Sequence, residues 1–209
     1  IIILIFRNLY WLEKAAAGYQ IINADFGVPQ PSYNNFYVNG EYRNKTRNRK
    51  WDMGLAGNFY IAGLNAGDYN VFALLKRLIG KQLGYLSLGF ENVNRSPSFI
   101  HNDLSNFKRF NIGNTNFKKE NTTVVTAEYE LPQLKLIVGG KYFLASNYIY
   151  FQNYTQAVQE ATLFNVLQLN AQTKFKLIRN INWYAEVYVQ QSTANAPVNL
   201  PLVYTRNRF

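Results

Sequence analysis

The chain of 209 residues lacks cysteine and contains a single histidine, His101. Without cysteine it can form no disulfide framework, thiolate nucleophile or cysteine-based zinc site. One imidazole with no second histidine also argues against a metal centre or a catalytic triad. We therefore expect no metal, no cofactor and no catalytic residues, and we predict that the protein is not an enzyme.

Charge and long apolar runs are also scarce. Charged residues make up 16% of the chain, against roughly 25% in an ordinary soluble domain. The longest uncharged apolar run, residues 1–6, ends at Arg7, whereas a membrane-spanning helix needs about 20 such residues. Aromatic residues are plentiful, with 16 tyrosines and 15 phenylalanines. This combination favours alternating strands that face lipid on one side, where the two ends of a tyrosine suit an apolar–water boundary.

The two ends of the chain carry no targeting signal. No basic segment and no small-residue cleavage site open the sequence. Residues 1–5 are typical of the middle of a fold, and residues 206–209 stop without a terminal signal, so we expect both native ends to be missing. The net charge of +10 permits three interpretations: nucleic-acid binding, contact with acidic lipid or sugar, or a cation-lined pore.

Apolar and polar residues alternate along much of the chain. Between Trp51 and Ile61 the odd positions are mostly apolar, while the even positions include Asp52, Asn58 and Tyr60. Several such segments reach ten residues or more, beyond the roughly 5–6 of soluble strands and near the 9–11 of membrane strands. We predict about eleven strands, near residues 1–8, 12–23, 34–43, 51–62, 69–76, 82–94, 122–131, 134–145, 162–178, 183–191 and 202–209.

The connections between these strands are sorted by length. Alternate gaps are mostly short (9–11, 44–50, 77–81, 132–133 and 179–182), and the others are mostly long (24–33, 63–68, 95–121, 146–161 and 192–201). Short turns at one rim and long loops at the other are typical of an outer-membrane β-barrel, whereas a soluble sandwich has no reason to sort its loops. The fold predicted is all-β, a transmembrane antiparallel β-barrel of which this chain is part.

Two hairpins allow the register to be predicted. If Leu131 opposes Leu134, the apolar faces of the two strands agree and Glu130 opposes Lys135. Pro132 cannot take the positive φ of a type I′ turn, so a wider turn remains possible. In the second hairpin, matching apolar faces place Glu186 beside Lys174 or Lys176.

Charged segments outside the strands leave alternatives open. The basic run 43–50, flanked by aromatic residues, is typical of a turn at the membrane rim, and nucleic-acid binding is the competing interpretation. The long 95–121 connection could fold inward as a basic constriction or remain an ordinary extracellular loop. The basic residues of that candidate constriction are Arg95, Lys108, Arg109, Lys118 and Lys119.

Five sequence blocks suggest a family. These are residues 60–69, 90–99, 116–121, 164–168 and 199–208, which include the stretches Ile61-Ala62-Gly63-Leu64-Asn65 and Arg95-Ser96-Pro97-Ser98-Phe99. In this order they resemble the "putative porin" family of Bacteroidetes outer membranes, over roughly residues 33–209. The resemblance implies a bacterial outer-membrane barrel longer than this chain, with residues 1–209 belonging to one barrel domain and with no catalytic residues to transfer.

We therefore predict a porin that lets small polar or anionic solutes diffuse passively, because basic residues exceed acidic ones. The alternative is a structural barrel subunit that docks in a larger outer-membrane protein assembly and conducts little. Expected partners are outer-membrane lipid or lipopolysaccharide, and either other outer-membrane proteins or further copies of the chain, but not nucleic acid. The carboxylates could in principle act as acid and base, yet solvated lumen groups suit them better. Candidate lumen-lining residues are Asp52, Asn58, Tyr60, Glu91, Glu128, Glu130, Lys135, Lys141, Lys174, Lys176 and Glu186.

Overall fold

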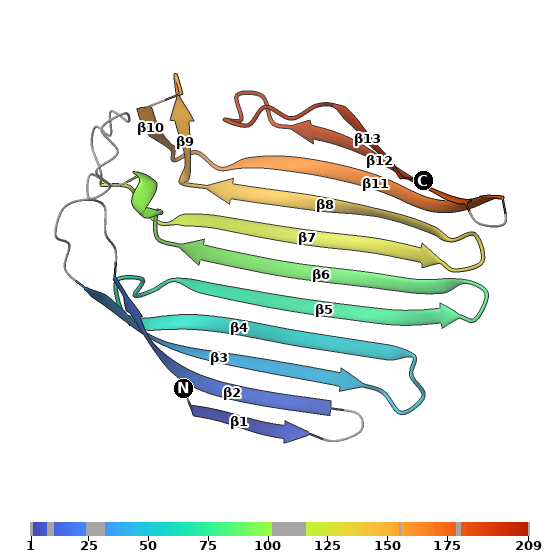
Figure 1. Cartoon of the computed structure of the whole chain (residues 1–209), viewed down its shortest axis with the longest axis horizontal. Helices are drawn as coiled ribbons and strands as arrows, with labels where there is room; N and C mark the ends of the chain where they lie inside the picture. Colours follow the sequence, from blue (N-terminus) through green and yellow to red (C-terminus); the bar gives the residue numbers. More distant parts are fainter. Residues whose placement is uncertain are drawn as a thin grey trace.

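The computed structural model describes residues 2–7, 11–23, 32–101, 116–154, 156–178 and 181–208. Within these residues the chain is built almost entirely of antiparallel strands, with one short 3₁₀ turn, η1 (Phe99–His101). The main sheet has eleven strands in the order β1-β2-β3-β4-β5-β6-β7-β8-β11-β12-β13 (Figure 1). A separate hairpin pairs β9 with β10. The predicted all-β antiparallel fold is therefore confirmed.

The strands of the main sheet are long. Nine of the eleven described have eleven residues or more, in the length range that membrane strands need. Their bounds, with those of the small hairpin, are β1 (Ile2–Arg7), β2 (Trp11–Ile22), β3 (Tyr33–Lys45), β4 (Trp51–Gly63), β5 (Tyr69–Gly80), β6 (Gly84–Arg95), β7 (Glu120–Leu131), β8 (Leu136–Ser146), β9 (Tyr148–Gln152), β10 (Gln156–Glu160), β11 (Phe164–Ile178), β12 (Ile181–Ser192) and β13 (Val203–Arg208).

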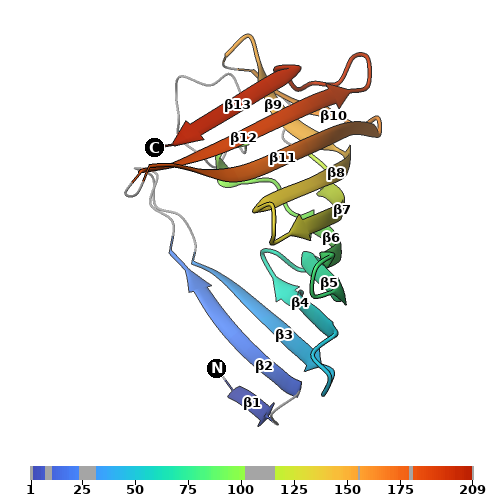
Figure 2. The ribbon, with the colours of Figure 1, turned by 90° about the vertical axis from the view of Figure 1, so that its right-hand side faces the viewer.

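The main sheet bends into an open trough. Viewed along the strands, it curves so that β1 and β13 lie at the two edges, on either side of the open side (Figure 2). Among the described residues β1 pairs only with β2 and β13 only with β12, so these strands do not close into a barrel. The structure thus shows the wall of a curved antiparallel sheet, not a closed ring. No helix in the described part of the chain is long and apolar enough to cross a membrane.

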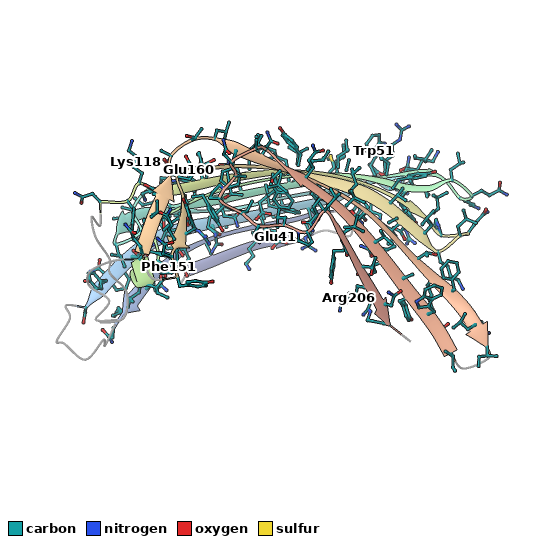
Figure 3. All side chains as sticks on the ribbon, turned by 90° about the horizontal axis from the view of Figure 1, so that it is seen from above. Glu41, Trp51, Lys118, Phe151, Glu160 and Arg206 are labelled. Carbon is teal, nitrogen blue, oxygen red and sulfur yellow. The ribbon has the colours of Figure 1, made fainter. Side chains whose placement is uncertain are left out.

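The two faces of the trough differ in chemistry. Because paired residues share a face, the register aligns Leu55, Ala73, Phe90, Val125 and Tyr142 in one row across neighbouring strands. This row belongs to the convex face, where large apolar side chains such as Leu88 (48% exposed) lie open to the surroundings. Figure 3 shows Trp51 on the convex side and Arg206 on the concave side.

The concave face is mainly polar and its side chains are more crowded. Along β3 the concave positions Tyr37, Asn39 and Glu41 are half-buried, whereas convex Val38 is exposed. Curvature explains this difference, because side chains on the inner side converge. Some apolar residues interrupt the polar face, including Phe72 on β5.

The register drifts steadily from strand to strand. The drift can be followed along one row of directly paired residues, from Ile5 on β1 to Ser192 on β12. Ile5 lies two residues from the end of β1 that is at the short-turn rim. Ser192 lies eleven residues from the end of β12 that is at the same rim. The drift is about one residue per strand. With a rise of about 3.3 Å per residue and a strand spacing of about 4.8 Å, it corresponds to a tilt of about 35°, the value expected for barrel strands.

The connections are sorted by end, as predicted. The turns between β5 and β6 and between β7 and β8, at residues 81–83 and 132–135, share one rim (Figure 1). The connection 64–68 and the described parts of the connections 96–119 (residues 96–101 and 116–119) and 147–163 (residues 147–154 and 156–163) lie at the other rim, as does the β9–β10 hairpin. That hairpin falls within a segment predicted to be loop, and a buried group of Ala145, Phe164 and Val166 packs near its base.

Both predicted hairpin registers are wrong by an even number of residues, although the faces are right. Leu131 pairs with Leu136, because residues 132–135 form a wider turn in which Lys135 takes a positive φ of 50°. Lys135 therefore lies in this turn and not on a strand. Glu186 pairs directly with Gln172, two residues from Lys174 and four from Lys176, the two predicted neighbours. A shift by two residues preserves the alternation of faces, so the sequence pattern alone could not exclude it.

A substitution of Gly84, at the β5–β6 turn, tests the backbone conformation of that turn. The φ of Gly84 is +82°, and a Cβ atom there would lie 1.9 Å from the carbonyl oxygen of Glu130. Gly84→Ala should lower the free energy of unfolding by about 2 kcal/mol or more. Gly54→Ala is the matched control, since no atom lies within 4 Å of its Cβ position. Equal urea midpoints for the two variants would contradict the described turn.

Candidate functional site: the concave face and its loop rim

Ten of the eleven predicted lumen residues lie on the concave face. The register places each of them on this face through a concave partner, such as Asp52 opposite Lys45 and Lys141 opposite Gln168. These ten are Asp52, Asn58, Tyr60, Glu91, Glu128, Glu130, Lys141, Lys174, Lys176 and Glu186. The exception is Lys135, in the β7–β8 turn. Their lining of a solute path stays a prediction.

Ion pairs cross the concave face near the short-turn rim. Lys76 Nζ on β5 lies 2.8 Å from Glu130 Oε2 on β7, so it reaches across β6. On the way it passes 4.5 Å from the ring centroid of Tyr85. Glu130 was predicted to lie opposite Lys135. Because the β7–β8 register differs from the prediction, Glu130 pairs with Lys76 instead. Lys45 Nζ also pairs with Asp52 Oδ2 at 3.1 Å, directly across β3 and β4.

A cluster of basic side chains, here called the cationic ladder, lies on the concave side of β11–β13 and consists of Lys174, Lys176, Arg206 and Arg208. The ring of Tyr184 has Lys174 Nζ 4.9 Å and Arg208 Cζ 5.4 Å from its centroid. Arg208 Nη2 also lies 3.0 Å from Glu186 Oε1, and the other oxygen of Glu186 accepts a hydrogen bond from Tyr188 at 3.1 Å. Both oxygens of this buried carboxylate are therefore engaged.

The ladder has more cations than its one carboxylate can balance. Lys174, Lys176 and Arg206 form no ion pair with a carboxylate among the described residues, and neither does Lys141 on the neighbouring strand β8. The carboxylates Glu91 and Glu128 lie on β6 and β7, toward the middle of the sheet. The concave face thus has a cation-rich flank at β11–β13.

The loop rim is tied together by the buried carboxylate of Asp68. Its Oδ1 lies 2.6 Å from Lys119 Nζ and accepts hydrogen bonds from the Ser96 amide at 2.9 Å and the Ser96 hydroxyl at 2.8 Å. Its Oδ2 accepts from Asn65 Nδ2 at 2.9 Å. Burial raises the pKa of Asp68, but the hydrogen bonds from Lys119, Ser96 and Asn65 outweigh it, so the net pKa lies below its ordinary value.

A second buried carboxylate, Glu120, joins three strands at the same rim. Its Oε2 lies 2.9 Å from Arg95 Nε at the end of β6. Its Oε1 accepts a hydrogen bond from the Ile149 amide of β9 at 2.9 Å. Arg95 and Lys119, two of the predicted constriction residues, are therefore held in ion pairs at the loop rim.

The remaining residues of the predicted constriction divide in two. Lys118 lies next to Lys119, and its backbone exchanges two hydrogen bonds with the side-chain amide of Gln159 on β10. Lys108 and Arg109 fall in residues 102–115, outside the described residues. An inward basic constriction therefore stays a prediction.

His101 lies in η1, against the β9–β10 hairpin. Its ring centroid is 5.1 Å from that of Phe151, and its Nδ1 is buried without a hydrogen-bond partner among the described residues. Burial lowers the pKa of His101, which favours the neutral imidazole. The described residues hold no group of three or more histidine, cysteine or carboxylate side chains arranged to bind a metal ion.

Sequence reasoning did not identify the two rim carboxylates or the two ladder arginines. Asp68 falls in the predicted connection 63–68, and Glu120 begins β7 two residues before the predicted strand 122–131. Arg206 and Arg208 lie two and four residues after Tyr204, a period-two spacing that could have placed all three side chains on one face. No local sequence pattern predicts the contact between Lys119 and Asp68, which lies 51 residues earlier in the chain.

Fold and concave face together define an all-β protein whose curved sheet has the two faces, the tilted strands and the sorted connections of a barrel wall. A family profile described as "Putative porin" matches residues 10–209, and the chain belongs to this family. No curated protein and no solved structure matches the chain. The Bacteroidetes origin stays a prediction.

Asp68 yields a pH-dependent prediction. Asp68→Asn should lower the free energy of unfolding at neutral pH by about 1–2 kcal/mol, because a buried charged hydrogen-bond acceptor is lost. A carboxylate with a depressed folded pKa stabilises the fold above its unfolded pKa of about 4, and this contribution disappears as pH falls through the folded value. The difference from wild type in urea unfolding should therefore shrink below pH of about 4.

Asp52→Asn is the matched control for this measurement. The Asp52–Lys45 pair is largely exposed, with 42% of the Asp52 side chain accessible against 8% for Asp68, so its loss should have little effect. A stability difference for Asp68→Asn that is the same at pH 7 and at pH 3, roughly one unit below the ordinary aspartate pKa, would contradict the described rim cluster.

Proposed function

We propose that the chain is part of a bacterial outer-membrane β-barrel whose concave face lines a passage for small polar or anionic solutes. The observation that carries this proposal is the division of the tilted sheet into a convex apolar face and a concave polar face. In a soluble protein, exposed residues such as Leu55, Leu88 and Leu169 would be costly, whereas lipid is their natural surroundings. Membership of a porin family agrees with a barrel that is not an enzyme.

Aromatic residues on the convex face support the membrane setting. At the short-turn rim the register places Tyr42, Trp51, Tyr129, Phe175 and Trp183 on this face. At the loop rim it places Tyr19, Phe36, Phe59 and Tyr69 there. The convex positions between the two rows are mostly aliphatic or small. Two aromatic belts that flank an aliphatic band are typical of the outer surface of a membrane barrel.

The cation-rich flank of the concave face supports a preference for anions. Lys174, Lys176 and Arg206 project from β11 and β13 without a carboxylate partner among the described residues. Fixed positive charge along a narrow aqueous path raises the local concentration of anions and repels cations.

Channel recording tests the proposed function. The purified full-length protein in planar bilayers should conduct and should pass chloride more readily than potassium. The double variant Lys174→Glu/Arg206→Glu should shift the reversal potential toward cation selectivity, because it reverses two concave charges. Arg77→Glu, on the convex face, should leave selectivity unchanged. A protein that never conducts, or wild-type selectivity for cations, would refute the proposal.

The second candidate is a barrel that docks other outer-membrane proteins, and one feature favours it. On the convex face of β6 and β7, Asn92 Nδ2 donates to Thr123 Oγ1 at 2.7 Å and to Asn121 Oδ1 at 3.2 Å. This polar patch lies at the loop rim, level with the aromatic row that it interrupts. Absence of conduction together with a protein partner retained through gentle detergent extraction would favour this candidate.

A further inference from the structure

A cavity of about 730 Å³ lies on the concave side at the short-turn rim. It is a partly open cavity bordered by the turn 46–50 and by neighbouring parts of β3, β4, β5, β6 and β7. Its volume is in the range of known small-molecule sites. The charged residues that line it are Lys45, Arg49, Lys50, Asp52, Lys76 and Glu130.

The turn 46–50 has a defined conformation. The Thr46 amide donates to the Trp51 carbonyl at 3.0 Å, and the Arg49 amide donates to the Thr46 carbonyl at 2.7 Å. The Thr46 hydroxyl donates to Asn48 Oδ1 at 2.7 Å and accepts from the Trp51 amide at 3.0 Å. These bonds hold Arg49 at a positive φ of 54°. The backbone of the turn is therefore fixed, and with it the positions from which Arg49 and Lys50 extend.

The turn is also anchored to the neighbouring strand. The Leu78 amide of β5 donates to the Lys50 carbonyl at 2.7 Å, which fixes the end of the turn against the sheet. Beside it, the guanidinium carbon of Arg77 lies 4.7 Å from the ring centroid of Trp51. The basic wall of the cavity therefore rests on the sheet and is not a free loop.

The charges around the cavity do not balance. The carboxylate of Asp52 is paired with Lys45 at 3.1 Å, and that of Glu130 with Lys76 at 2.8 Å. Arg49 and Lys50 have no carboxylate partner among the described residues. Two unneutralised cations therefore face a cavity whose other charges are already matched.

We propose that this cavity binds a small ligand that carries two or more negative charges as phosphate or carboxylate groups. Arg49 offers a planar guanidinium fork and Lys50 a mobile ammonium group, which together suit a polyanion. The Lys45 and Lys76 ammonium groups add positive potential nearby. The ligand is either a dissolved polyanion or a lipid headgroup with two phosphates at the membrane edge, as in cardiolipin. Binding at this site does not require that the barrel conducts.

Calorimetric titration of the detergent-solubilised full-length protein with inorganic pyrophosphate tests the site. Arg49→Asn removes the guanidinium and keeps a residue that tolerates positive φ, and Lys50→Gln removes the ammonium group. We expect the double variant to bind pyrophosphate about tenfold or more weakly than wild type, since charged hydrogen bonds are lost. Its far-ultraviolet circular dichroism and urea midpoint should stay close to those of the wild type.

Arg47→Asn/Lys81→Gln is the matched control, because it removes the same two charges from the same rim and neither residue lines the cavity. Its affinity for pyrophosphate should stay within about twofold of wild type at physiological salt, because exposed charges that do not contact the ligand contribute little once salt screens them. Equal weakening in both double variants would show only general attraction to a basic rim and would overturn the proposal. Absence of binding to the wild type would overturn it as well.

Nanodiscs separate the two sources of the ligand. If the site takes a lipid with two phosphates, nanodiscs that contain cardiolipin should reduce the affinity of the wild type for pyrophosphate relative to phosphatidylcholine nanodiscs. The Arg49→Asn/Lys50→Gln variant should lose this difference. If the site takes a dissolved anion, pyrophosphate should bind equally well in both. Either result supports the anion site. A protein that conducts but binds no pyrophosphate would refute this site and leave the proposed pore standing.

Discussion

Paired residues in an antiparallel ladder point to the same face of the sheet, and every other feature of this protein depends on that constraint. Alternation along one strand becomes a continuous surface only because neighbouring strands keep the same parity. Leu55, Ala73, Phe90 and Val125 form one apolar row in this way, and Asp52, Lys76 and Glu130 meet on the opposite face. Because the sheet is curved, the apolar side chains on the convex face spread apart and the polar side chains on the concave face converge.

The same constraint explains what the sequence could and could not predict. Strand positions and faces follow from period two, which is local, so ten of the eleven predicted lumen residues lie on the concave face. Register is set by turn geometry, and the turn at 132–135 is two residues wider than Pro132-Gln133 alone suggested. The pairing of Glu130 with Lys76 instead of Lys135 follows directly from that difference. The β9–β10 hairpin was missed because its strands are five residues each, too short for a periodic signal.

The two rims are stabilised by different means. At the loop rim, the buried carboxylates of Asp68 and Glu120 collect hydrogen bonds from segments that are distant in sequence, and they tie β6, β7 and β9 together. At the short-turn rim, the described turn 46–50 is fixed largely by local bonds around Thr46, and the described turns carry basic side chains such as Arg49, Lys81 and Lys135. Carboxylates are thus used to hold structure at one end, while cations are left without carboxylate partners at the other end and along β11–β13.

The central claim is that the convex face meets lipid and the concave face meets water. The absence of cysteine allows this to be measured with single cysteines at adjacent positions, Ser87→Cys on the concave face and Leu88→Cys on the convex face. In proteoliposomes, a water-soluble maleimide should label position 87 and spare position 88 until the protein is denatured. Equal labelling of both positions in the folded protein would contradict the account.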